Sequence, residues 1–465
     1  MASGPERFVA QAAYSSEFAR ARELLLAHPG RWRIVYHYDG DGIASASALV
    51  RALRRLGYGV QATPLVGVER PTMAKIVEAT AGPLLVADTG ASWLDLFAAH
   101  PHPVIVLDHH RYPASPAPAD LPRHVAFVNP LDWGVDGMSE LCASTLCWLY
   151  TVFLDPRNWD NAPWGLSGAI ADRQHQGGYR GLNARLLEEA AARSLIQRHR
   201  RIALFGARLA EAIERSIDPY FRGLSGRPDE VRAFLAGLTI DPLTPLDRLD
   251  RAEEQRLTAV LLNRLVQQKV RPEFCELLTQ DGWTIPALGM DAQELSNLQN
   301  AAGRAGEPSV GVALALGDPA ARERAREHEA AWRTGILTGL RRIEDGGVNS
   351  RAALQWFESP ETTLAGTQAG LAMNYLLDPR RPVFVFSREG EVLKVSARGT
   401  LWLVGQGLDL ATVCREAADR VHGEGGGHPV ASGATIPGAG RDLFLEEADR
   451  RIGAQLAALL AGDGR

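Results

Sequence analysis

Residues 33–57 have the sequence RIVYHYDGDGIASASALVRALRRLG, and they decide the fold. The first six, Arg33–Tyr38, form a short run typical of a β-strand. Small and apolar residues then follow at helical spacing as far as Gly57, a typical helix stop. Two further apolar runs, Pro83–Ala87 and Pro103–Leu107, predict two more strands. This alternation of strands and helices indicates a parallel sheet with helices on its faces.

The chain has 465 residues and is 46% hydrophobic, which is enough to build more than one core. We expect an α/β protein with a parallel-sheet domain at residues 1–190, a mostly helical connecting region at 191–342 and a mixed α/β domain at 343–465. Helical patterns at Leu186–Ile217 and Pro319–Arg342 support the middle region. In residues 381–398, RPVFVFSREGEVLKVSAR, two alternating runs around Arg388-Glu389-Gly390 predict a β-hairpin.

The composition excludes several classes of protein. A net charge of -5 argues against a protein that coats nucleic acid through bulk positive charge. The apolar segments are too short to span a bilayer, and residues 1–23 lack the pattern of a secretory signal, so we expect a cytoplasmic protein with no membrane partner. The chain has four cysteines, too few for a disulfide framework, and we expect buried or free thiols at Cys142, Cys147, Cys275 and Cys414.

Acidic motifs follow each of the three predicted strands. They are His37-Tyr38-Asp39-Gly40-Asp41-Gly42, Asp88-Thr89-Gly90 and Asp108-His109-His110. The carboxyl ends of parallel strands face one crevice, so these side chains should converge. Carboxylates and imidazoles are ligands of divalent cations such as Mn²⁺ and Mg²⁺. Gathered aspartates repel each other unless cations neutralise them, so the pattern predicts a metal site.

A simpler explanation exists for each motif taken alone. An aspartate after a strand most often caps a helix or shapes a turn, and DxD or DTG is a weak signal. Three such clusters in order, the third a DHH triplet, are hard to explain by capping. The joint pattern therefore favours a metal centre.

The motifs also resemble those of a known family. HYDGDG, ADTG, LDHH and AIAD (Ala169–Asp172) resemble the four successive motifs of the DHH phosphoesterase superfamily. GGGHPVASG (Gly425–Gly433) resembles the signature of its companion DHHA1 domain. HYDGDGIASASAL, NPLDWGVDGMSE and LSNLQNAAGRAG (Leu295–Gly306) are similar in particular to archaeal RecJ-like single-strand-specific exonucleases. The resemblance runs from about Arg33 to Gly433.

The resemblance implies a role for each motif residue. One or two Mn²⁺ ions, with Mg²⁺ as the alternative, would be bound by His37, Asp39, Asp41, Asp88, His109 and Asp172, and Asp88 would bridge them. Asp108 would orient its neighbours, and His110 would face the scissile phosphate. The substrate would contact His428, Arg398, Gly425, Gly426 and Gly427. A glycine-rich turn after a helix is otherwise often only a cap and reversal, and an exposed arginine after a strand is unremarkable.

The resemblance implies a metal-dependent phosphodiesterase, a RecJ-like exonuclease that hydrolyses single-stranded DNA or RNA from an end by two-metal-ion catalysis. It also implies a role in DNA repair or replication, with the GINS replication complex as a partner. Two alternatives stay open. One is a DHH phosphatase that acts on small oligonucleotides or nucleotides, and the other is a GINS-binding replication scaffold with weak or no nuclease activity.

Overall fold

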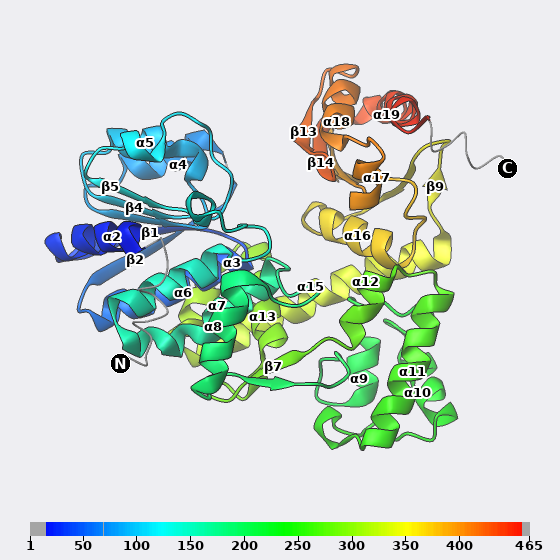
Figure 1. Cartoon of the computed structure of the whole chain (residues 1–465). Helices are drawn as coiled ribbons and strands as arrows, with labels where there is room; N and C mark the ends of the chain where they lie inside the picture. Colours follow the sequence, from blue (N-terminus) through cyan, green and yellow to red (C-terminus); the bar gives the residue numbers. More distant parts are fainter. Residues whose placement is uncertain (1–14, 68, 458–465) are drawn as a thin grey trace. The chain divides into compact units, whose positions relative to one another are not determined.

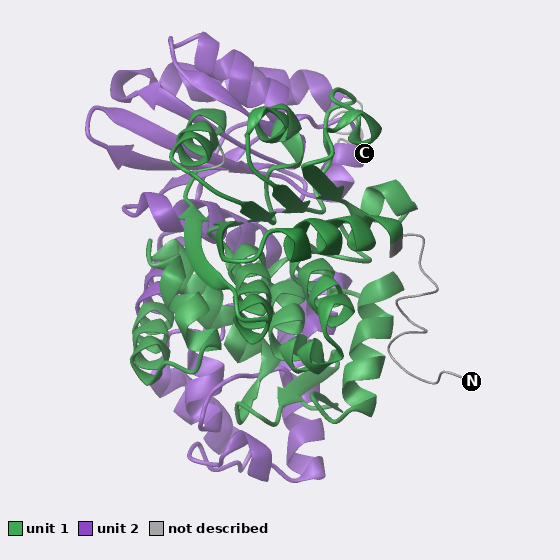
Figure 2. Ribbon diagram, turned by 90° about the vertical axis from the view of Figure 1, so that its left-hand side faces the viewer, with its two compact units in different colours: residues 1–201, 280–330 green, residues 202–279, 331–465 purple. Residues whose placement is uncertain are grey.

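The computed structural model describes residues 15–67 and 69–457. The chain forms two compact units, one of residues 1–201 and 280–330 and the other of residues 202–279 and 331–465 (Figure 2). The two units share the expected connecting region, residues 191–342, so the three-part division at 190 and 342 stays a prediction. Residues 1–14, which belong to the N-terminal stretch without the pattern of a secretory signal, lie outside the described residues.

The first unit contains a five-stranded parallel sheet with the strand order β2-β1-β3-β4-β5. The strands are β1 (Arg31–His37), β2 (Gly59–Leu65), β3 (Leu84–Ala87), β4 (Val104–Leu107) and β5 (Val125–Val128). The three predicted strands β1, β3 and β4 are confirmed, and they form the centre of the sheet. The outer strands β2 and β5 were not predicted.

Both faces of this sheet are buried, which explains its continuous apolar runs. On one face, Val35, Val86 and Val106 pack with α4 (Arg70–Glu78) and α5 (Leu94–Ala99). On the other face, the neighbouring strand residues pack with α2 (Ser15–Ala27), α3 (Gly40–Arg55) and α6 (Ala143–Leu154). Figure 1 shows these two helical layers on either side of the strands.

Glycines allow the turn between β1 and α3 to be tightly enclosed. A Cβ on Gly42 would lie 2.1 Å from the carbonyl oxygen of His37. A Cβ on Gly303, in α13 (Ala292–Arg304), would lie 2.0 Å from the carbonyl oxygen of Tyr38. The segment LSNLQNAAGRAG therefore packs against HYDGDG, although the two are far apart in sequence. The other neighbours of α3 are α7 (Ala162–Ala171) and α14 (Pro308–Ala315).

The helical pattern predicted over Leu186–Ile217 is wrong beyond Ala192. Helix α8 ends there, and Ser194 adopts a left-handed backbone with φ 58°. A short strand, β6 (Gln197–His199), then pairs with β7 (Gly282–Ile285), which in turn pairs with β8 (Met290–Asp291). The helical structure resumes only at α9 (Leu209–Glu214). Local periodicity does not reveal a strand whose partner lies so far along the chain.

The second unit contains a mixed six-stranded sheet with the order β13-β14-β12-β11-β10-β9. The strands are β9 (Asn349–Ser350), β10 (Gln355–Glu358), β11 (Val383–Glu389), β12 (Val392–Arg398), β13 (Glu424–His428) and β14 (Ala431–Pro437). Strands β11 and β12 are antiparallel and turn at Gly390, which has φ 60°, so the predicted hairpin is confirmed. The glycine-rich segment is not a loop, because it forms the edge strand β13.

Helices cover both faces of this second sheet. On one side, Phe384 and Phe386 pack with α18 (Leu410–Asp419) and α19 (Arg441–Gln455). On the other, Val383 and Val385 pack with α16 (Thr362–Tyr375) and a helical cluster. The cluster comprises α9, α10 (Pro228–Gly237), α11 (Arg251–Gln267), α12 (Pro272–Cys275) and the second half of α15 (Pro319–Gly346). The expected α/β class is confirmed.

Two smaller expectations concern the whole chain. Within residues 15–67 and 69–457, no helix combines the length and the apolar character needed to cross a membrane. All four cysteines are free thiols, as predicted, and three of them are buried.

Candidate metal centre

The predicted metal ligands lie at the carboxyl edge of the parallel sheet and at the end of one helix. Asp39 is the N-cap residue of α3, and Asp41 lies in its first turn. Asp88 follows β3 directly, and His109 follows β4 after one residue. Asp172 is the C-cap residue of α7.

The structure brings all six predicted ligands together. Their donor atoms form overlapping groups in which every atom lies within 4.8 Å of the others, and the groups are His37/Asp39/Asp88, Asp41/His109/Asp172 and Asp88/His109/His110. Asp88 and His109 each belong to two groups. Asp88 is the one carboxylate that two of these groups share, and its bridging of two cations stays a prediction.

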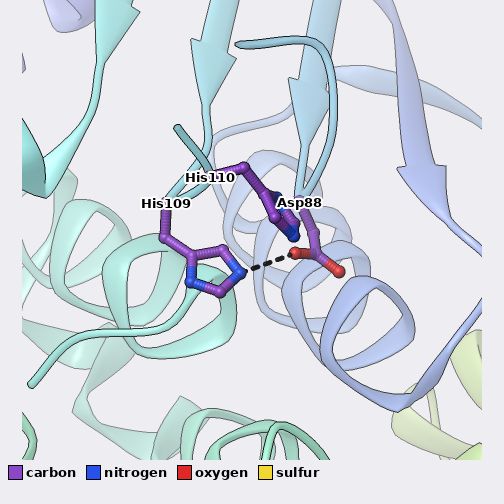
Figure 3. A group of neighbouring side chains, drawn as sticks. All are labelled: Asp88, His109 and His110. Carbon is purple, nitrogen blue, oxygen red and sulfur yellow. Dashed lines mark ion pairs between the residues drawn. The ribbon is translucent and has the colours of Figure 1, made fainter. Parts of the chain in front are cut away.

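Asp88 and His109 face each other across the centre of the site (Figure 3). The Asp88 Oδ1 atom lies 3.3 Å from His109 Nε2, and Asp88 has a left-handed backbone with φ 58°. On the other side of the ring, His109 Nδ1 lies 2.7 Å from the carbonyl oxygen of Gly137. A carbonyl oxygen only accepts hydrogen bonds, so Nδ1 carries a proton and Nε2 is directed towards the carboxylates.

Asp41 is the most deeply embedded carboxylate of the site. Its two oxygens accept hydrogen bonds from the backbone N–H groups of Ala143 and Ser144, at 2.9 and 3.0 Å, at the start of α6. Burial, followed by the charges of Asp88 and Asp172, nevertheless raises the pKa of Asp41 to about 8. Burial likewise raises the pKa of Asp172 to about 6.

The donor set fits a divalent cation. In the described part of the chain, no lysine or arginine forms an ion pair with the carboxylates of Asp39, Asp41, Asp88 or Asp172. Buried like charges without such partners are unfavourable, and the raised pKa values of Asp41 and Asp172 express that cost. Oxygen and imidazole donors without thiolates suit Mn²⁺ or Mg²⁺.

His37 lies between two carboxylates. Its Nδ1 atom lies 3.0 Å from Asp39 Oδ1 and 3.6 Å from Asp88 Oδ2. Burial lowers the pKa of His37, but the hydrogen bonds to Asp39 and Asp88 outweigh it and raise the pKa to about 11. A metal ligand must be neutral imidazole, so binding of a cation by His37 requires loss of this proton.

Asp108 and His110 form a separate pair beside these donors. Asp108 accepts hydrogen bonds from the backbone N–H groups of Ala91 and His109 and from His110 Nδ1, each at 2.8 Å. Burial raises the pKa of Asp108, but the hydrogen bond from His110 outweighs it and the pKa falls below its usual value. The His110 side chain is 53% exposed, so it is open to a ligand while Asp108 orients its ring.

Sequence reasoning missed two residues that support the predicted ligands. Gln174 donates hydrogen bonds to Asp172 Oδ2 and to the Gly137 carbonyl oxygen, both at 2.7 Å. The same carbonyl oxygen accepts the hydrogen bond from His109, so Gln174 connects Asp172 with His109. Asn300, in the segment LSNLQNAAGRAG, accepts a hydrogen bond from the backbone N–H of Gly40 at 3.0 Å. Its place in that segment was the signal that could have identified it. Gln174 had no signal beyond its closeness to Asp172.

The predicted substrate residues lie in the second unit. Arg398 ends β12 and His428 ends β13, and both are opposite Ala431 of the strand between them. The sheet therefore places Arg398 and His428 in one row at the same end.

The glycines beside them differ from one another. A Cβ on Gly425 would lie 2.3 Å from the Cys414 carbonyl oxygen, whereas a Cβ on Gly426 would meet nothing within 4 Å. Packing thus explains Gly425, and phosphate contact by any of these residues stays a prediction.

Two segments of the chain match known protein families. Residues 31–168 match the model of the DHH family, N-terminal domain, and residues 361–454 match that of the DHHA1 domain. The chain belongs to the DHH/DHHA1 superfamily. The DHH domain contains β1 to β5 with their acidic motifs, and the DHHA1 domain contains Arg398 and His428. The DHH superfamily consists of phosphoesterases, and the donor groups described above are able to bind divalent metal.

Known proteins resemble this DHH/DHHA1 chain in sequence or in fold. An uncharacterized protein of Methanocaldococcus jannaschii is 28% identical over 440 residues, which cover 94% of this chain and 96% of the relative. The crystal structure of exonuclease RecJ bound to manganese matches with a TM-score of 0.58 and 20% identity over 94% of each chain.

Two further solved structures match over most of the chain. RecJ in complex with Mn²⁺ from Thermus thermophilus gives a TM-score of 0.57 and 19% identity over 94% of this chain, which spans only 54% of that RecJ. CDC45 from Entamoeba histolytica gives a TM-score of 0.65 and 10% identity over 94% and 97% of the two chains. These likenesses establish a RecJ-like fold.

Proposed function

We propose that this protein is a metal-dependent phosphodiesterase that removes nucleotides from an end of single-stranded DNA or RNA. The observation that carries the proposal is the set of overlapping donor groups centred on Asp88 and His109. The chain has a suitable side chain at every metal-binding position that the DHH resemblance implies. Its fold is shared with an exonuclease. A net charge of -5 is compatible with this activity if local cations supply much of the attraction for phosphates.

The chain's own residues would divide the work as follows. Asp39, Asp41, Asp88, His109 and Asp172, with His37 beside them, would hold one or two divalent cations. When bound, such cations supply positive charge to phosphoryl oxygens and lower the pKa of water. His110 is exposed and oriented by Asp108, so it would hydrogen bond to the phosphate or donate a proton to the leaving sugar oxygen. Arg398 and His428 would hold phosphates of the strand.

The direct test is digestion of single-stranded DNA and RNA of graded length, labelled at the 5′ or 3′ end, with Mn²⁺ or Mg²⁺. We expect a ladder that starts from one end, and we expect Asp88→Ala to remove it. Cleavage restricted to the shortest oligonucleotides would instead establish the small-substrate phosphatase. No cleavage with either metal would overturn the proposal.

A GINS-binding scaffold is the alternative from a different class. The fold does not separate the two, because both an exonuclease and CDC45 share it. The complete donor set favours hydrolysis. Binding of GINS through residues 191–342 is an additional proposal, tested by a pull-down with wild-type protein and Asp88→Ala. Equal binding by both, together with no cleavage by wild type, would favour the scaffold.

A further inference from the structure

A second binding site is suggested by a cavity in the DHHA1-containing unit. The cavity has a volume of about 590 Å³, within the usual range of small-molecule sites. Its walls come from the end of β11, the start of β12, the end of α15 and the turn before α19, and they include Phe386, Arg388, Leu393, Arg342 and Ala439. All of these elements belong to one compact unit.

This cavity is distinct from the predicted phosphate contacts of Arg398 and His428. In the hairpin, Val383 pairs with Arg398 at one end and Glu389 pairs with Val392 at the other. Arg388 and Leu393 also pair, next to that second end. At about 3.3 Å per residue, the two ends of a seven-residue strand are separated by roughly 20 Å. One phosphate therefore does not reach both places.

The charges around the cavity favour an anion. Arg441 forms ion pairs with Glu358 at 2.6 Å and with Asp442 at 3.1 Å, so it engages both acidic residues of the wall. Arg342 and Arg388 are exposed and, among the described residues, have neither an ion pair nor a side-chain hydrogen bond. Two unpaired guanidinium groups beside one cavity can both donate to a phosphate.

The size of the cavity and its exposed apolar wall residues fit an organic ligand rather than a bare inorganic ion. Pro360 and Ala439 are exposed apolar residues of the wall, whereas Phe386 and Leu393 are only 1% and 6% exposed and contribute little surface. A nucleotide base would contact Pro360 and Ala439, and its phosphate would be bound by Arg342 and Arg388 of the same cavity. We propose that the cavity binds a phosphate-bearing ligand of nucleotide size through these two arginines. The source is either a free nucleotide or a nucleotide within a strand.

Isothermal titration calorimetry in EDTA tests the site without hydrolysis. The probes are adenosine diphosphate and a twelve-residue oligothymidylate, and the variants are Arg342→Ala/Arg388→Ala and His428→Ala. The matched control is Arg248→Ala/Arg256→Ala, which removes two exposed arginines of the same unit that also have no ion pair in the described chain. We expect only the first variant to weaken adenosine diphosphate binding, by about tenfold or more, because charge-assisted hydrogen bonds are lost.

Each result decides the proposal. If Arg342→Ala/Arg388→Ala is the only variant that binds adenosine diphosphate more weakly, the ligand of the cavity is a free nucleotide. Weaker binding of only the oligothymidylate in that variant supports a nucleotide within a strand. If the wild type binds neither probe, or if the variant matches the Arg248→Ala/Arg256→Ala control, the proposal is overturned. Circular dichroism confirms that the variants are folded, and the separate nuclease assay reports on the metal centre independently.

Discussion

His109 is held between Asp88 and the backbone of Gly137, with its Nε2 atom 3.3 Å from Asp88 Oδ1. The Gly137 carbonyl fixes which nitrogen carries the proton, and so directs the other nitrogen towards the carboxylates. A Cβ on Gly137 would lie 2.3 Å from the His109 carbonyl oxygen, so only glycine allows this approach. The DG pair at 136–137 therefore positions His109, a predicted metal ligand that follows a different strand.

Replacement of His110 should reduce turnover and leave metal binding intact. Its ring is oriented by Asp108 and is open on its other side, as expected of a group that contacts substrate. We expect His110→Ala to lower kcat by about 10²- to 10⁴-fold, the usual contribution of general acid–base catalysis. Calorimetric titration with Mn²⁺ checks the second half of the prediction. A large loss of Mn²⁺ affinity would show that His110 is itself a ligand.

Gln174→Ala should weaken metal binding although Gln174 is not a predicted ligand. Its amide orients Asp172 and shares the Gly137 carbonyl with His109. Loss of such a supporting contact usually costs about 10- to 100-fold in metal affinity or activity. Activity measured against Mn²⁺ concentration should recover at high Mn²⁺. The control is Gln176→Ala, because in the described structure the Gln176 side chain makes no hydrogen bond, and it should behave as wild type.

The metal-free protein should lose stability as the pH rises towards 8. The folded state keeps Asp41 protonated up to a pKa of about 8, whereas the unfolded chain releases that proton near the ordinary aspartate pKa. The folded state thus binds more protons in this window, and its free energy of unfolding falls with increasing pH. The pKa values of Asp172 and His109, both raised, act in the same direction.

Denaturant unfolding in EDTA at about pH 6 and about pH 8 measures this dependence. Asp41→Asn should flatten it, and Mn²⁺ should stabilise the wild type more at the higher pH because protons compete with the cation. A stability that is constant or rises between these pH values would contradict the prediction.

The neighbouring glycines of β13 should respond differently to alanine. Gly425→Ala places a Cβ against the Cys414 carbonyl oxygen and should destabilise the fold by about 1–3 kcal/mol, as overpacking usually does. Gly426→Ala meets nothing within 4 Å and should leave the free energy of unfolding nearly unchanged or slightly increased. Denaturant unfolding of the two variants checks this contrast. Equal effects would show that the packing of β13 against α18 does not distinguish them.

Much of the site could be predicted because its residues stand at strand ends. Asp39, Asp88 and His109 follow apolar runs that are recognisable locally, and the carboxyl edge of a parallel sheet brings such positions together. Asp172 ends a helix and follows no strand, so only the AIAD resemblance indicated it. Gln174 donates a hydrogen bond to the distant Gly137 carbonyl oxygen, and nothing in its local sequence predicts that contact, whereas Asn300 stands in a segment that the resemblance had singled out.

The sequence by itself determined the parallel sheet, its three central strands and the hairpin at Gly390, and it placed most of the predicted metal ligands at strand ends, because each depends on patterns within a few residues. Only the tertiary structure decided that β6 replaces a helix, that β13 is a strand and that Asp41 is embedded against the start of α6. Those outcomes depend on pairing and burial between segments far apart in the chain, where long-range packing energies outweigh local preference.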